Sequence, residues 1–207
     1  NGNFFHSVPS GFKMLTQDNM PETAKGITGM SWTKDRDSGS YNHELYDSSR
    51  GAFQEIRPNA TTAENTRPQA LSKFLKGGFA VGDRTGMNSA GNRYVSWNWV
   101  ANGGTTASNT DGSIASSVQA NTTAGFSIVT YTGTGSAGTI GHGLSTAPKW
   151  IWVKQLNSTG HFSVYLGVLG GTKISYTSVD VVNSSNSTYW NNTDATSSVF
   201  SVGTNAD

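Results

Sequence analysis

The sequence predicts an all-β protein, an antiparallel β-sandwich of the jelly-roll or concanavalin-like kind with two related units. The first observation is compositional: of 207 residues 34% are hydrophobic and only 13% charged, and the rest are mostly Gly, Ser, Thr and Asn. Such residues are typical of turns and of strands with one solvated face. The second is the content of six Trp, seven Tyr and nine Phe, apolar area that disordered chains lack. The third is a period-two alternation in several segments.

The alternation is clearest in residues 91–101, where Val95, Trp97 and Trp99 give one face of a predicted strand a wall of large side chains. We expect at least one face of each such strand, including those that carry Trp32, Trp150 and Trp152, to lie in the core.

Turn signals separate these strands. The stretches "DRDSG" and "NSTG" predict hairpin turns in which Gly39 and Gly160 are able to take positive φ. One short helix is predicted over residues 67–78, because Pro68 suits a first helical turn and Gly77 suits a C-cap.

Two units are predicted on either side of residues 102–125, a Gly-, Ser-, Thr- and Asn-rich stretch that is linker-like. Residues 30–52 align with residues 151–171 at an offset near 120, as a duplicated unit would give. The aligned pairs are Trp32 with Trp152, Lys34 with Lys154, Tyr46 with Tyr165, Gly51 with Gly170, Phe79 with Phe200 and Gly82 with Gly203. We therefore place the units at 23–116 and 117–207.

Charge and cysteine content exclude several classes of function. The net charge is +1 and no basic cluster is longer than a pair, so we expect no nucleic-acid partner and no anionic-membrane partner. No apolar run approaches 18 residues, so no membrane insertion is expected. Cysteine is absent, which rules out disulfides and thiolate zinc sites. The start at Asn1 rather than Met predicts that the sequence is part of a longer chain.

Residues 126–143, "FSIVTYTGTGSAGTIGHG", contain a G-x-G-x-x-G pattern. Such glycines bind a pyrophosphate only when they open a helix and an acidic residue follows about 20 positions later. Neither condition holds, so we predict two strands, at 126–132 and 150–154, joined by a flexible connection. His142 could act as a general base on that connection, but a turn residue that hydrogen-bonds backbone is the favoured interpretation.

Glu44 and Asp47 are the best pair of carboxylates for glycosidic hydrolysis, which needs two that flank the bond. Three residues apart on a strand, they point to opposite faces, so we interpret Asp47 as a turn cap paired with Arg50. Asp35-x-Asp37-x-Gly39 begins like a calcium loop but lacks the closing Glu, and a hairpin turn explains it better. The four histidines show no metal-binding spacing. No catalytic residue, metal site or cofactor is predicted.

Glycan contact is the remaining candidate chemistry. Tyr41 and the Tyr189–Trp190 pair neighbour polar loop residues. In such a loop a flat aromatic ring can stack on the face of a sugar, while Asn and Ser side chains hydrogen-bond to the hydroxyl groups of that sugar. Packed loop aromatics are at least as common, so a structural role stays open. The candidate glycan contacts are Tyr41, His43, Tyr189, Trp190 and Asn191.

Several stretches resemble a repeated module of virion appendage proteins of marine tailed phages. They are "LYDSSRG", "YVSWNWVA", "DGSIASSVQAN" and "AGFSIVTYTGTGSAGTIGHGLSTAPKWIWVK", together with residues 190–200. Residues 4–22 resemble the closing strands of a SPRY-like sandwich, so we expect residues 1–22 to be the end of such a module. The first unit lacks a clear counterpart of the second unit's opening strand, and the second stops before the expected N-x-x-G-x-Y-V strand.

The resemblance implies a non-enzymatic part of a tail fibre at the virion surface, which adheres to a host glycan or protein through loops and contacts other virion proteins. A homo-oligomer is expected, because open sandwiches expose edge strands that fibres bury between subunits, and the resemblance implies a trimer. Two alternatives stay open: a capsid decoration or scaffold protein without a ligand, and a polysaccharide depolymerase.

Overall fold

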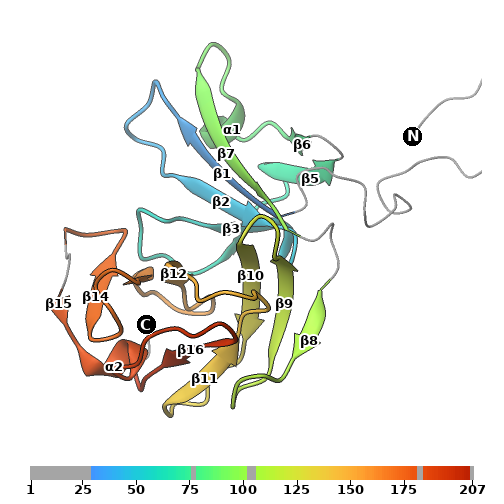
Figure 1. Cartoon of the computed structure of the whole chain (residues 1–207). Helices are drawn as coiled ribbons and strands as arrows, with labels where there is room; N and C mark the ends of the chain where they lie inside the picture. The colour runs from blue at the N-terminus through green and yellow to red at the C-terminus, as the bar shows by residue number, and fades with distance from the viewer. Residues whose placement is uncertain (1–28, 76–77, 102–105, 181–183, 206–207) are drawn as a thin grey trace, which may run out of the picture.

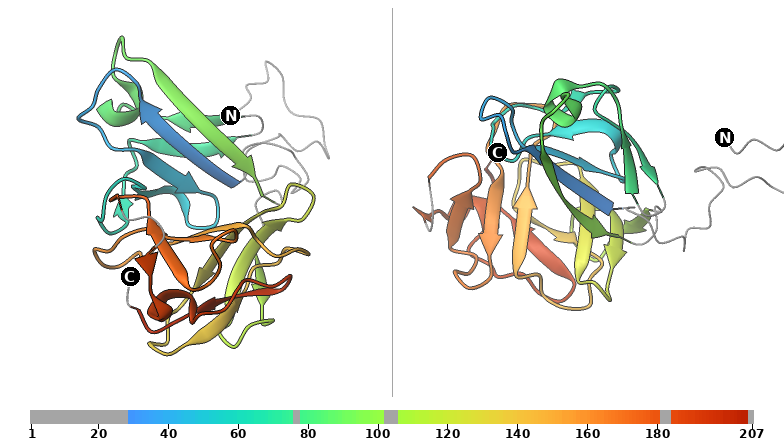
Figure 2. Two further views of the ribbon diagram at one scale, coloured as in Figure 1. Left: turned by 60° about the vertical axis from the view of Figure 1, so that its left-hand side comes forward. Right: turned by 90° about the horizontal axis from the view of Figure 1, so that it is seen from above.

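The computed structural model describes residues 29–75, 78–101, 106–180 and 184–205, and it confirms an all-β fold of several antiparallel sheets. The helices in these ranges are two single turns, α1 Thr85–Asn88 and α2 Ser187–Trp190, so no helix there has the length or apolar content to cross a bilayer. The SPRY-like segment expected over residues 1–22 lies outside the described residues. Figures 1 and 2 show two lobes stacked on one another, β1–β7 in one and β8–β16 in the other.

The first lobe is a five-stranded sheet in the order β4-β3-β2-β1-β7, covered on one face by the hairpin β5-β6. Its strands are β1 Gly29–Asp35, β2 Glu44–Asp47, β3 Gly51–Ile56, β4 Asn65–Thr66, β5 Leu71–Leu75, β6 Gly78–Val81 and β7 Tyr94–Val100. Strand alternation divides the side chains between the two faces. Tyr46 packs under the hairpin with Leu71, Phe74 and Met87, whereas Leu45 next to it points to the opposite face.

The second lobe consists of three smaller sheets. They are β10-β9-β8, β11-β16 and β12-β13-β14-β15, and one parallel bridge, Ile114 to Ile140, links the first two. The strands are β8 Ala107–Asn109, β9 Ser116–Asn121, β10 Phe126–Tyr131, β11 Gly138–Gly141, β12 Trp150–Val153, β13 Ser163–Leu166, β14 Lys173–Tyr176, β15 Ser184–Ser185 and β16 Val199–Val202. Buried Ile140 and Phe200 form one core of this lobe, and Tyr165 with Trp190 forms another.

A shared apolar cluster joins the lobes. Leu45 and Ile56 from the first lobe pack on Phe162 from the second, with Trp152 and Leu156 around them. Two backbone hydrogen bonds cross the same boundary, from Glu64 N–H to the carbonyl of Leu156 and from Gly160 N–H to that of Thr61, each 2.8 Å. The first-lobe sheet is therefore covered on both faces, by its own hairpin and by the second lobe.

The β1-β2 and β12-β13 hairpins have equivalent registers. Trp32 lies opposite Leu45, and Trp152, 120 positions later, lies opposite Val164, which is 119 positions after Leu45. Lys34 donates through Nζ to the carbonyls of Asp35 and Ser38, and Lys154 donates to those of Gln155 and Ser158.

The glycines that follow the two hairpins also have equivalent backbone conformations, since Gly51 (φ 110°) and Gly170 (φ 77°) both have positive φ. Shared register, lysine contacts and glycine conformation support a duplicated hairpin, as the aligned residues predict.

Three expectations about elements are wrong. The helix expected over 67–78 is replaced by strand β5, which pairs with β6, and a register shift between Leu71 and Lys73 allows Leu71 and Phe74, three residues apart, both to be buried. The linker expected over 102–125 contains strands β8 and β9, whereas the unit bounds 23–116 and 117–207 stay a prediction. The hairpin connections at Gly39 and Gly160 are present, but neither glycine has positive φ.

Candidate functional site

Four tryptophan rings form a continuous row across the junction of the lobes. In order they are Trp97, Trp32, Trp152 and Trp150, and we call them the tryptophan row. Neighbouring ring centroids lie 5.3, 5.3 and 5.0 Å apart, within the range of favourable aromatic pairs. The two end residues are the exposed ones, Trp97 at 43% and Trp150 at 57%. The row therefore has a packed middle and two exposed ends.

Strand geometry explains why these rings meet. Trp32 in β1 lies opposite Trp97 in β7, so the two side chains share one face of the sheet. Trp150 and Trp152 lie two residues apart in β12 and therefore also point to one face. Contact between the lobes brings Trp152 edge-on to Trp32, and the two pairs become one row. Sequence reasoning placed these tryptophans in core-facing strands and missed that two of them reach the surface.

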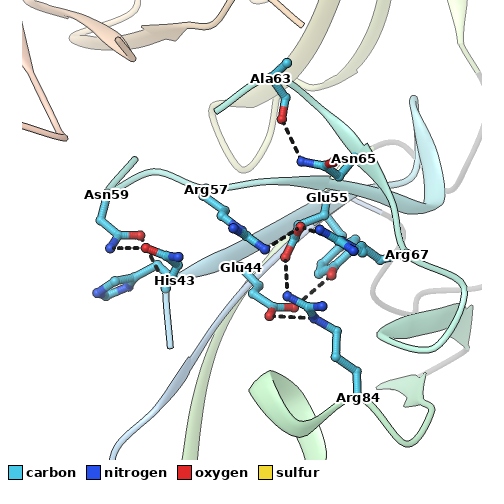
Figure 3. Close-up of polar contacts among 11 residues, drawn as sticks. His43, Glu44, Glu55, Arg57, Asn59, Ala63, Asn65, Arg67 and Arg84 are labelled. Carbon is cyan, nitrogen blue, oxygen red and sulfur yellow. Dashed lines mark hydrogen bonds and ion pairs between the residues drawn. The ribbon is translucent and has the colours of Figure 1, made fainter. Parts of the chain in front are cut away.

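His43 lies beside the row. The Trp32 indole Nε1–H donates to His43 Nδ1 at 2.9 Å, and the two ring centroids are 5.5 Å apart. This contact needs a neutral imidazole, and burial, followed by the charge of Lys34, lowers the pKa of His43 below its usual 6.5. The His43 backbone N–H donates to Asn59 Oδ1, and the Asn59 amide donates to Asn42 Oδ1 (Figure 3). The two amide groups therefore lie beside His43, which itself contacts Trp32 in the middle of the row. The half-buried Tyr41 belongs to the same β1-β2 connection as His43.

The structure does not bring the other predicted contacts to this row. Tyr189 and Trp190 are in α2 and are buried, with Trp190 edge-on to Tyr165 at 5.7 Å. Their ring faces are therefore not available for stacking at the surface, although both line a small cavity described below. Asn191 is exposed and ends the helix in the left-handed conformation at φ 50°. As ligand contacts, these three residues stay a prediction.

A buried carboxylate network holds the other face of the first-lobe sheet (Figure 3). Glu44 Oε1 pairs with Arg84 Nε at 3.0 Å, and Glu44 Oε2 accepts the Tyr46 hydroxyl at 2.8 Å. Glu55 Oε1 pairs with Arg84 Nη2 at 3.2 Å, and its Oε2 pairs with Arg57 and Arg67 at 3.1 and 3.3 Å. Every carboxylate oxygen of the two glutamates is therefore occupied by a protein donor.

The electrostatics of this network fit a structural role. Burial, followed by the charge of Glu55, raises the pKa of Glu44, and the neighbouring carboxylates raise the pKa of Arg84 against its own desolvation. Burial also raises the pKa of Tyr46 far above its usual 10. Asp47 accepts from the Arg50 backbone N–H at 2.9 Å and pairs with its side chain, which confirms the expected turn cap. Sequence reasoning paired Glu44 with Asp47 and missed Glu55, which folding brings to Glu44 from the neighbouring strand β3.

The remaining polar candidates are turn residues, as expected. Leu144 N–H donates to His142 Nδ1 at 3.1 Å, so Nε2 carries the proton and donates to the carbonyl of Thr196 at 3.1 Å. Asp35 Oδ1 accepts the backbone N–H groups of Asp37 and Ser38, which closes the β1-β2 turn. Among the described residues, no three His, Asp or Glu side chains converge as a metal site would require.

Fold and site define a two-lobed all-β protein with a partly exposed aromatic row across the lobe junction and two buried glutamates, Glu44 and Glu55, paired with arginines. The chain belongs to the family described as a domain of unknown function, DUF7483, whose model matches residues 13–207. No curated protein and no protein of known structure matches the sequence.

Proposed function

We propose that this chain is a non-enzymatic adhesion module of a phage virion appendage, such as a tail fibre, that contacts a host-surface glycan or protein through the tryptophan row. The observation that supports this proposal is the exposure of Trp97 and Trp150 at the two ends of one row of tilted and edge-on tryptophan contacts. Exposed tryptophan faces are costly to leave in water, and they suit the apolar faces of sugar rings and the centres of protein interfaces. The amides of Asn42 and Asn59 beside His43 suit the hydroxyl groups of a sugar.

Non-enzymatic binding is favoured by the state of the acidic groups. A depolymerase needs two carboxylates with room for a sugar between them. Glu44 and Glu55 are instead buried, and Arg84 lies between them with its guanidinium bonded to both. Access of a polysaccharide to this pair would require removal of Arg84 and loss of the packing under the β5-β6 hairpin.

The small size of the site implies that strong binding requires several copies of it. Two exposed rings bury little area, so each contact would be weak, and a homo-oligomer would combine several of them. A trimer is the arrangement that the resemblance to phage appendages implies. The exposed tryptophans lie on β7 and β12, which are edge strands of their sheets in the described ranges and are therefore able to meet a neighbouring subunit or a ligand.

The test is retention of purified protein on bacterial envelope fractions and on arrays of bacterial polysaccharides. Wild type is expected to bind, and Trp150→Ala and Trp97→Ala are each expected to weaken binding by about tenfold or more. Phe53→Ala is the matched control, because Phe53 is an aromatic residue of similar exposure in β3 that lies outside the row.

Three results would contradict the proposal. No binding by the folded wild type would favour the capsid decoration or scaffold alternative. Release of reducing sugar from a polysaccharide would favour the depolymerase alternative. Equal losses in Phe53→Ala and Trp150→Ala would show that the row has no special part in binding.

A further inference from the structure

A small cavity lies in the second lobe between α2 and strands β10, β12, β13 and β16, with a volume of about 40 Å³. Its apolar walls come from the rings of Tyr131 and Tyr189 and from valine side chains of β12 and β16. Burial raises the pKa of Tyr131 to about 12, so this hydroxyl stays neutral at ordinary pH. Asn205 also lines the cavity and is solvent-exposed, which places it at the mouth. None of the residues that line the cavity carries a charge.

Two buried polar groups of this lining have no partner in the protein. They are the Ser163 hydroxyl, in a residue that is 1% exposed, and the Trp190 indole Nε1–H, in a residue that is 2% exposed. A buried donor without an acceptor is costly, and such groups are rare in folded proteins unless water or a ligand bonds to them. The cavity therefore presents one fixed donor and one hydroxyl that can donate or accept.

The duplicated unit shows what fills the equivalent place in the first lobe. In the first lobe, Gly82 N–H donates to the carbonyl of Ala70, and Arg84 N–H donates to the carbonyl of Gln69. The residues 121 positions later make the same bonds in the second lobe: Gly203 N–H donates to the carbonyl of Tyr189, and Asn205 N–H donates to the carbonyl of Thr188. Asn205 is thus the counterpart of Arg84, by the same hydrogen-bond pattern.

In β2 and β13, Glu44 and Ser163 are likewise counterparts, opposite Thr33 and Val153. The first lobe fills this place with the Arg84 guanidinium and its carboxylates, whereas the second lobe has shorter, neutral side chains and a cavity.

We propose that this cavity binds the acetamido group of an N-acetylated amino sugar. A volume of about 40 Å³ accommodates roughly three water-sized groups, which matches the carbonyl and methyl of an acetamido group. The carbonyl oxygen accepts from Trp190 Nε1–H, the Ser163 hydroxyl bonds to the same group, and the methyl packs on the valine and tyrosine walls. The Asn205 amide at the mouth suits a ring hydroxyl of the sugar. An uncharged lining excludes carboxylate and ammonium groups, which would be buried without a counter-charge.

This site is separate from the tryptophan row, since Ile151 and Val153 of β12 face α2 while Trp150 and Trp152 face the other way. The proposal therefore stands or fails independently of the proposed adhesion surface, and Trp150→Ala is expected to leave it intact.

The experiment is a titration of ¹⁵N-labelled protein with N-acetylglucosamine, followed through the Trp190 indole N–H signal, which a Trp190→Phe variant assigns. We expect that signal to shift with a Kd in roughly the millimolar range, as befits a monosaccharide, and glucose at the same concentrations to leave it in place. Asn205→Phe, which blocks the mouth from an exposed position, is expected to weaken binding by about tenfold or more. Thr204→Phe is the control, because Thr204 is exposed next to Asn205 and does not line the cavity.

A second variant, Ser163→Ala, keeps the cavity and removes one hydrogen-bond partner, and it is expected to weaken binding while the remaining spectrum shows the native fold. The proposal is overturned if N-acetylglucosamine shifts no cavity signal in the folded protein, which would leave water as the occupant. Equal shifts with glucose, or unchanged affinity in Asn205→Phe, would overturn it as well.

Discussion

At the scale of single residues, the most constrained group is Arg84. Its guanidinium contacts both Glu44 and Glu55, two carboxylates that are almost fully buried. A buried ion pair adds little net stability compared with an apolar replacement, but removal of one partner leaves an unpaired buried charge. The network therefore fixes the position of the segment around α1 on β2 and β3 more than it adds to the total stability.

This arrangement predicts that Arg84→Met strongly lowers the stability of the fold. We expect a loss of about 3–5 kcal/mol in the free energy of unfolding, measured by urea denaturation, because two buried carboxylates lose their shared cation. Arg93→Met is the control, since Arg93 is mostly exposed in its pair with Asp37, and its loss of stability is expected to be much smaller than that of Arg84→Met. Similar costs for the two variants would contradict the account of the network.

Proton binding by the His142 ring is expected to cause part of the pH dependence of stability. Burial lowers the pKa of His142 below its usual 6.5, so the unfolded chain binds the proton more readily than the folded chain. The stabilising contribution of the neutral ring is therefore present above pH 6.5 and is lost as the pH falls below it. We expect the fall in melting temperature between about pH 7.5 and pH 5.5 to be smaller in His142→Gln than in wild type. An equal fall in both proteins would contradict this assignment.

Sequence reasoning worked at this scale where the partners are close along the chain. Asp47 with Arg50, the Asp35 turn and the backbone contacts of His142 were all predictable, because local geometry determines them. Glu55 was not, since its contact with Arg84 spans 29 residues and depends on how β3 and the segment after β6 fold together.

At the scale of elements, glycine marks the places where two backbones approach most closely. A Cβ on Gly82 would lie 2.4 Å from the carbonyl oxygen of Gln69, and one on Gly203 would lie 2.1 Å from that of Thr188. These contacts are counterparts in the two lobes, and no side chain can be accommodated without movement of the backbone. The alignment of Gly82 with Gly203 was visible in the sequence, whereas its cause needed the structure.

Gly82→Ala and Gly203→Ala are therefore both expected to destabilise the protein by about 1–3 kcal/mol, as overpacked sites do. Gly39→Ala is the matched control, because a Cβ on Gly39 would meet no atom within 4 Å and its backbone does not take positive φ. Thermal denaturation of the three variants tests this. A neutral Gly203→Ala would contradict the close approach.

Strand prediction succeeded where alternation is strong and failed where local signals outweighed it. The segments that form β7, β10 and β12 were all predicted strands. Pro68 and Gly77 favoured a helix for the segment that forms β5, but burial of Leu71 and Phe74 under the sheet determines its conformation instead. The register shift between Leu71 and Lys73 disturbs the period-two alternation, so the sequence carries no clear strand signal for β5.

At the scale of the whole molecule, the tryptophan row exists only because the two lobes pack together. Trp32 and Trp152 come from different lobes, and the cluster of Leu45, Ile56 and Phe162 holds them in contact. The sequence indicated two related units but contained no local signal for the surface between them.

Phe162→Ala is predicted to weaken the junction. Truncation of a buried phenylalanine lowers the free energy of unfolding by about 3–5 kcal/mol. In Phe162→Ala the contacts that are lost are those between Phe162 and the first lobe. We expect calorimetry to show one unfolding transition for wild type and two separated transitions for Phe162→Ala. A single transition in the variant, shifted as a whole, would indicate that the lobes unfold as one unit independently of this cluster.

The central claim is that the exposed ends of the tryptophan row contact the ligand, and ¹⁹F NMR of protein labelled with fluorotryptophan tests it most directly. The six tryptophans give six signals that single substitutions assign. On addition of an envelope glycan that the protein retains, the account predicts that the signals of Trp97 and Trp150 shift or broaden first. Binding that leaves both signals unchanged would contradict it.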